Sequence, residues 1–142
     1  MPKSNLLPSP DKKKYSKEHV LTLLFIYYFK NILSINDIRS ILNPLTEKYF
    51  GNDDGFTMQD VYTEVFGLEA EESQKLLKDL GKKYKIAGET FENFPAEDQK
   101  FLHTFSFICM LSFDVYIKKM LIERMIDDLN EENEASKTGG KN

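Results

Sequence analysis

Cysteine and tryptophan are nearly missing from this sequence, which has one cysteine, Cys109, and no tryptophan. A lone cysteine cannot form an intramolecular disulfide or a paired-thiol zinc or redox site. We therefore expect a chain that folds in a reducing compartment, the cytoplasm. The motifs GxxxxGK[ST], GxGxxG and GxSxG are also absent. Because no nucleophile, base and oxyanion donor can be assembled from the sequence, we do not expect an enzyme.

Metal ligands are scarce as well, since the chain has two histidines, His19 and His103, in no HxxxH or HExxH spacing. The turn-rich stretch "GNDDGFTMQD" lacks the ligand spacing of a calcium loop. We expect no metal and no cofactor. His19 is expected at the surface or beside a helix cap.

Long apolar runs are also lacking. The best membrane candidate, Phe101 to Ile117, contains His103 and Asp114 and is shorter than the roughly 20 residues of a spanning helix. Asp114 precedes Lys118 by four residues, which is the favourable order for a helical ion pair. No apolar segment follows the N-terminal lysines before Val20, so neither a secretory signal nor a membrane partner is expected.

Charge is unevenly distributed over the 142 residues, whose net charge is −4. The first 19 residues hold five lysines against two acidic residues, whereas residues 123–134 hold six acidic residues against one arginine. The overall balance excludes a uniformly basic nucleic-acid coat. The hydrophobic fraction of 41% and the aromatic fraction of 13% are enough for one buried core.

Cap and periodicity signals predict an all-α helical bundle, because no strand-period segment is long enough for a sheet. Ser16, Ser34 and Thr57 have N-cap spacing, and Pro44 predicts a helix restart after Asn43. The expected helices cover about 16–31, 35–42, 45–50, 57–66, 69–84 and 95–129. We expect one helical domain over residues 1–130 and a disordered tail over 131–142, which has nothing apolar to bury.

The last predicted helix is the longest and carries apolar residues at a seven-residue interval, at Phe101, Ile108, Val115, Ile122 and Leu129. Such a stripe is typical of a packing face inside a bundle or of a coiled-coil dimer seam. Ile108, Val115 and Ile122 are therefore candidates for a protein interaction or homodimer surface.

The segment Val20 to Phe29 is apolar nearly all round, which predicts burial on most faces. We expect it to pack against the long helix through the aromatic side chains of both. A small-molecule effector pocket between them, with Tyr27, Tyr28 and Tyr116 orienting the ligand, is an alternative to a solid aromatic core.

The stretch "LLPSPDKKKYSKEHVLTLLFIYYFKNILSINDIRSIL", Leu6 to Leu42, resembles the second half of a MerR-type winged helix-turn-helix domain. From Leu6 to about Leu129 the chain is similar to an uncharacterised family of Firmicute proteins. That family is classed as a domain of unknown function and carries the same signature before a helical C-terminal region. The segments "KKKYSKEH", "IYYFKNILSINDI" and "FSFICMLSFDVYIKK" carry the closer likeness.

The resemblance implies a transcription regulator that binds DNA. It divides the chain into a MerR-like remnant at 1–50 and a helical region at 56–130, and it matches Lys12, Lys13, Lys14 and Tyr15 to a wing that contacts the DNA backbone. In MerR-like proteins two short helices precede the Leu-Leu-Pro turn and read the major groove. Since this chain supplies only Met1 to Asn5 there, we expect no sequence-specific binding by it, and weak phosphate binding with a log–log salt slope of roughly −3.

Overall fold

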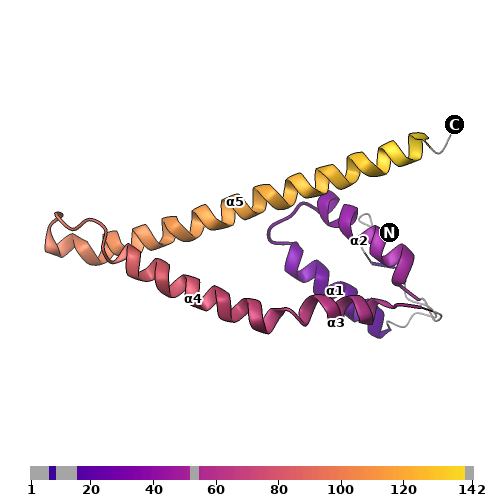
Figure 1. Ribbon diagram of the computed structural model, residues 1–142, viewed down its shortest axis with the longest axis horizontal. Helices are drawn as coiled ribbons and strands as arrows, with labels where there is room; N and C mark the ends of the chain where they lie inside the picture. Colours follow the sequence, from indigo (N-terminus) through magenta and orange to yellow (C-terminus); the bar gives the residue numbers. More distant parts are fainter. Residues whose placement is uncertain (1–6, 9–15, 52–54, 140–142) are drawn as a thin grey trace. The chain divides into compact units, whose positions relative to one another are not determined.

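The computed structural model describes residues 7–8, 16–51 and 55–139, and over these residues it contains five helices and no strand (Figure 1). The helices are α1 (Lys17–Phe29), α2 (Ile35–Tyr49), α3 (Met58–Phe66), α4 (Glu69–Ala87) and α5 (Ala96–Gly139). The predicted all-α class, with a long C-terminal helix, is confirmed. No helix among the described residues has the length and apolar content needed to cross a membrane.

Two compact units divide the chain. Unit 1 comprises Met1–Gly67 and Leu121–Asn142, and unit 2 comprises Leu68–Met120. The predicted division at residues 50–56, which follows the family resemblance, stays a prediction. The long helix α5 contributes its first part to unit 2 and its last part to unit 1.

The predicted helix starts are confirmed at three N-caps. The Oγ atoms of Ser16 and Ser34 accept hydrogen bonds from the backbone N–H three residues later. Thr57 and Asp60 form a reciprocal capping box, in which the Asp60 carboxylate accepts the Thr57 N–H at 2.8 Å. Each cap satisfies backbone donors that the first helical turn leaves without partners.

The predicted break at Pro44 is wrong, because α2 is one helix of 15 residues with Pro44 inside it. Proline removes one backbone donor and crowds the preceding turn, which normally costs about 3 kcal/mol. Two hydroxyls bond to backbone carbonyls around it, from Ser40 to Asn36 at 3.0 Å and from Thr46 to Asn43 at 3.2 Å. Burial of Ile38 and Leu42 on one side of α2 holds the helix against this cost.

The long helix α5 also departs from the prediction, since it continues to Gly139 rather than ending near Leu129. Residues 131–139, which we expected to be disordered, are therefore helical in the structure. Glutamate is a good helix former, and extending an existing helix avoids the cost of nucleation. Residues 131–136 are exposed and still helical, so the absence of apolar residues to bury does not prevent a helix here.

Unit 1 has a hydrophobic core built from all three short helices and α5. Phe25, Ile38, Leu42 and Met58 are buried there, together with Ile126 of α5. Phe25 packs against two rings of α3, Tyr62 at 6.3 Å and Phe66 at 5.5 Å between centroids, and α1 and α3 lie side by side in Figure 1. The aromatic partners of α1 therefore come from α3.

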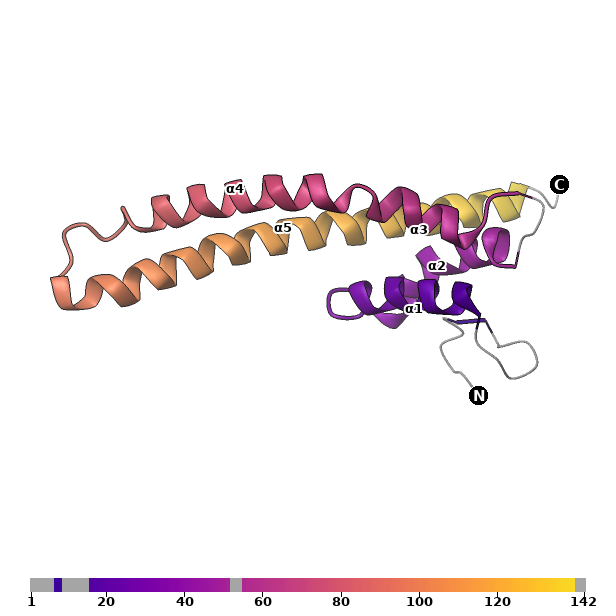
Figure 2. The same ribbon diagram turned by 90° about the horizontal axis from the view of Figure 1, so that it is seen from below.

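Unit 2 is an antiparallel pair of helices joined by a turn over residues 88–95 (Figure 2). The turn is held by Thr90, whose hydroxyl lies 2.8 Å from the Ser106 hydroxyl and whose carbonyl lies 2.9 Å from His103 Nε2. Tyr84 and Phe107 make an edge-to-face ring contact beside it, at 5.5 Å between centroids. Beyond the turn, α4 and the unit 2 part of α5 separate in Figure 1. Ala87 is the one residue of unit 2 that is buried.

Candidate functional site

The predicted DNA-contacting residues Lys12, Lys13, Lys14 and Tyr15 lie outside the residues that the structure describes. Pro8 and Ser16, which flank the segment 9–15, are described. The sequence predicts a loop over residues 9–15, here named the basic loop, and the geometry beside it can be built from the described residues that flank it.

One imidazole, that of His19, contacts both ends of the basic loop. Its Nε2 lies 2.9 Å from the Pro8 carbonyl oxygen, and its Nδ1 accepts the Ser16 backbone N–H at 3.0 Å. The ring also meets Phe50 edge-on at 4.8 Å between centroids, and His19 is only 3% exposed. His19 is beside the cap, as expected, but it is buried rather than at the surface.

The hydrogen-bond partners of this imidazole assign a role to each ring nitrogen. A carbonyl oxygen can only accept, so Nε2 carries the proton and donates it to Pro8. Nδ1 accepts from Ser16 N–H and therefore carries no proton.

The neighbouring Glu18 fastens a second connection in unit 1. One carboxylate oxygen accepts the backbone N–H of Gly51 at 2.8 Å, and the other accepts that of Met58 at 3.2 Å. Gly51 has a φ of 72°, in the left-handed region that glycine adopts without a steric penalty. Glu18 thus joins the start of α1 to the end of α2 and the start of α3.

The predicted interaction stripe is divided between the two units. Ile108 and Val115 belong to unit 2 and are 54% and 59% exposed. Ile122 belongs to unit 1, where it packs against the buried core. The interaction surface stays a prediction, and Ile108 and Val115 share a shallow apolar hollow of about 300 Å³ with Leu111 and Ser112.

The predicted burial of the aromatic side chains is also wrong for several of them. Tyr27, Tyr28 and Tyr116, proposed to orient an effector, are all more than half exposed. Phe101 and Phe113 of α5 are exposed as well. An α-helix with apolar residues on most faces can leave some of them uncovered when its neighbours are few, which sequence periodicity does not reveal.

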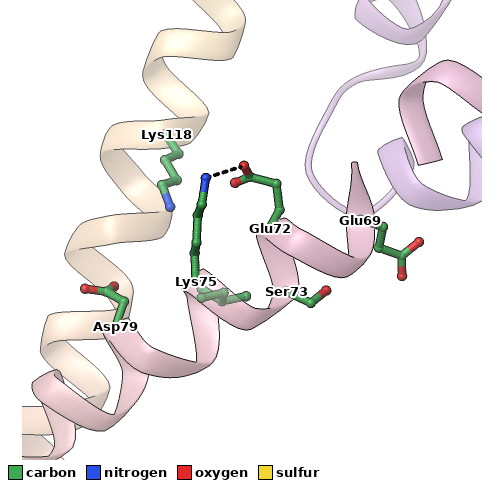
Figure 3. A pocket seen from close by; sticks show the side chains of 7 residues that line it. Glu69, Glu72, Ser73, Lys75, Asp79 and Lys118 are labelled. Carbon is green, nitrogen blue, oxygen red and sulfur yellow. Dashed lines mark ion pairs between the residues drawn. The ribbon is translucent and has the colours of Figure 1, made fainter. Parts of the chain in front are cut away.

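A gap of about 420 Å³ opens between α4 and α5 within unit 2 (Figure 3). Lys75 of α4 and Lys118 of α5 extend along it, and Glu72 pairs with Lys75 at 3.6 Å. The lining therefore carries both signs of charge, which favours neither an anionic nor a cationic ligand. Leu76 supplies apolar surface in the same gap.

Two ion pairs of unit 2 border this gap. Asp114 and Lys118 pair at 3.2 Å, as the sequence spacing predicted. Lys83 donates a hydrogen bond to Asp79, one turn earlier in α4. That bond lowers the pKa of Asp79 below its ordinary value and raises the pKa of Lys83 above its own. Among the described residues no group of three or more His, Cys, Asp or Glu side chains is arranged to hold a metal ion.

The N-terminal part of the chain is similar to a family of domains. Residues 2–65 match the family model of a domain of unknown function (DUF1836). The DUF1836 match includes the basic loop, His19, Glu18 and most of α3, and it ends close to the boundary of unit 1 at Gly67. Neither the curated proteins nor the solved structures give a significant match to the chain.

Sequence reasoning missed the role of Glu18 because its partners lie 33 and 40 residues away, at distances that no local pattern encodes. A signal for His19 was present. It occupies the third helical position after the Ser16 cap, where a side chain can reach back to the cap backbone. The position is usually taken by glutamate or glutamine, so the histidine was not recognised as a cap partner.

Proposed function

We propose that the protein is a DNA-binding regulator of transcription, of the MerR-like type, whose basic loop contacts the DNA phosphate backbone. The observation that carries the proposal is that the His19 ring forms hydrogen bonds with both Pro8 and Ser16, the residues that flank that loop. A loop tied at both ends loses less conformational freedom when it binds, which favours binding. The resemblance of Leu6 to Leu42 to a winged helix-turn-helix domain supports the same reading.

The chemistry of the loop supports contact with phosphate rather than with base edges. Lys12, Lys13 and Lys14 are consecutive, and lysine binds phosphate as a point charge without selecting a sequence. Each phosphate neutralised on duplex DNA contributes about −0.9 to the slope of log affinity against log salt. Three contacts therefore imply a loss of roughly 40-fold in affinity between about 50 and 200 mM salt.

The test is fluorescence anisotropy of a labelled DNA duplex, titrated with the full chain at several salt concentrations. The variant with Lys12, Lys13 and Lys14 replaced by Ala should bind more weakly, and its salt slope should be smaller in magnitude by about 3. The matched control replaces the exposed Lys48, Lys100 and Lys119 with Ala, which removes the same charge elsewhere.

The control variant should retain the wild-type salt slope. Equal losses in the two triple variants would mean that net charge alone attracts DNA, and would overturn the assignment to the loop. Wild-type protein without salt-sensitive DNA binding would overturn the DNA-binding proposal itself.

A further inference from the structure

Unit 2 exposes more apolar surface than a two-helix pair can cover. Eight large apolar side chains of α5 between Phe101 and Met120, and three of α4, are at least half exposed, whereas Ala87 is the one buried residue of the unit. Side chains of these sizes together present on the order of 1,000 Å². A standard interface buries about 800 Å² per partner, so the summed exposed apolar area is comparable to what an interface needs.

Two exposed residues of α4 form a stripe on one face of the helix. Leu77 and Tyr84 lie seven residues apart. This is the spacing of a helix that packs along another helix at a shallow angle. Both side chains are 67% exposed, although Tyr84 contacts Phe107 of α5. The stripe therefore presents apolar surface of α4 that α5 does not cover.

The charges of α4 indicate which helix could cover this stripe. Its first turn is acidic, with Glu69, Glu71 and Glu72, and its end is basic, with Lys82, Lys83 and Lys85. This polarity suits the helix dipole, and it also makes α4 complementary to an antiparallel copy of itself. Glu69 and Lys83 flank the stripe at equal distances from Leu76, so an antiparallel copy placed about Leu76 brings Glu69 of each chain beside Lys83 of the other.

We propose that two copies of the chain associate through unit 2, with α4 antiparallel to the α4 of the second copy, to form a four-helix bundle from two helical pairs. Such a bundle gives the exposed apolar residues of α4 and α5 the core that unit 2 lacks. The proposal is independent of DNA binding, because it involves residues 68–120 and neither the basic loop nor its base.

The first test is the molar mass of the full chain by light scattering after size-exclusion chromatography, over a range of loading concentrations and without DNA. We expect twice the mass of a single chain. The variants Leu77→Glu and Ile108→Glu should each weaken association by at least about ten-fold. Ile35→Glu, which places the same charge at an exposed apolar position of unit 1, should leave the mass unchanged.

The second test measures whether the two α4 helices are antiparallel. In a Cys109→Ser background, Glu69→Cys and Lys83→Cys chains are mixed and treated with a flexible bis-maleimide reagent. Antiparallel association should cross-link the mixture efficiently and either chain alone poorly. A monomer at all concentrations, or association insensitive to both glutamate substitutions, would overturn the proposal. Efficient cross-linking of Glu69→Cys chains to themselves would overturn the antiparallel arrangement.

Discussion

Replacing His19 with Ala removes several contacts at once from the base of the basic loop. The ring donates to the Pro8 carbonyl at 2.9 Å, accepts from Ser16 N–H at 3.0 Å and packs edge-on against Phe50 at 4.8 Å. Because His19 is 3% exposed, water cannot replace these contacts without entering the space that the ring leaves. The substitution therefore tests whether this side chain holds the start of α1, the loop and α2 together.

The expected loss of stability follows from these contacts. Two hydrogen bonds contribute about 0.5–1.5 kcal/mol each, and an aromatic pair about 0.5–1.5 kcal/mol beyond its buried area. We expect His19→Ala to lower the free energy of unfolding by about 2–4 kcal/mol. Urea unfolding followed by far-ultraviolet circular dichroism measures this difference as a lower midpoint at an unchanged slope.

Two isosteric variants separate the contacts. The amide of Asn can occupy the position of Nδ1 and accept from Ser16, whereas the amide of Gln can reach the position of Nε2 and donate to Pro8. Both variants of His19 should be more stable than His19→Ala, and only His19→Gln should retain the DNA affinity that depends on the Pro8 end of the loop. A cost below about 1 kcal/mol for His19→Ala, or identical stability of all three variants, would refute this reasoning.

Three further predictions concern the backbone, a surface ion pair and the Glu18 connection. Gly81→Ala should raise the free energy of unfolding by about 0.5–1 kcal/mol, because an added Cβ in α4 meets no atom within 4 Å. Gly67→Ala should lower it, because the added Cβ would lie 2.7 Å from the carbonyl oxygen four residues earlier. Thermal unfolding of both variants measures the two effects. In an NMR pH titration the Asp79 carboxyl should titrate below its ordinary range, and it should return to that range in Lys83→Met. Because the pKa of Asp79 is depressed in the folded protein, any stability that it provides is present above the ordinary carboxyl pKa and is lost as the pH falls. Glu18→Gln leaves one of two backbone donors without an acceptor and should cost about 1–3 kcal/mol in urea unfolding, whereas a cost near zero would show that water replaces the contact.

Features that depend on nearby residues were predictable from the sequence. The caps at Ser16, Ser34 and Thr57 and the Asp114–Lys118 ion pair all join residues three or four positions apart, and all four are present. At this range the helix geometry itself brings the partners together. The all-α class followed from the same local signals.

Features that depend on what covers a helix were not predictable in this way. Pro44 was read as a break because the burial of Ile38 and Leu42, which keeps α2 continuous, is a tertiary effect. The sequence predicts His19 only at the surface or beside a helix cap, and no local pattern marks Glu18 as a residue that connects helices. The partners of these two residues lie in segments that come close only when unit 1 folds.

The stripe along α5 shows why a regular pattern cannot name its partner. Ile108, Val115 and Ile122 follow one period and lie on one continuous helix, yet Ile122 packs against a core while the other two are exposed. Period determines which residues share a face, and the neighbouring chain determines whether that face is filled. In unit 1 the neighbours are α1, α2 and α3 of the same chain. In unit 2 the described residues supply only one neighbouring helix, α4, and Ile108 and Val115 remain exposed. The proposed second copy would cover this face of α5, and the charge polarity of α4 is the argument for that occupant.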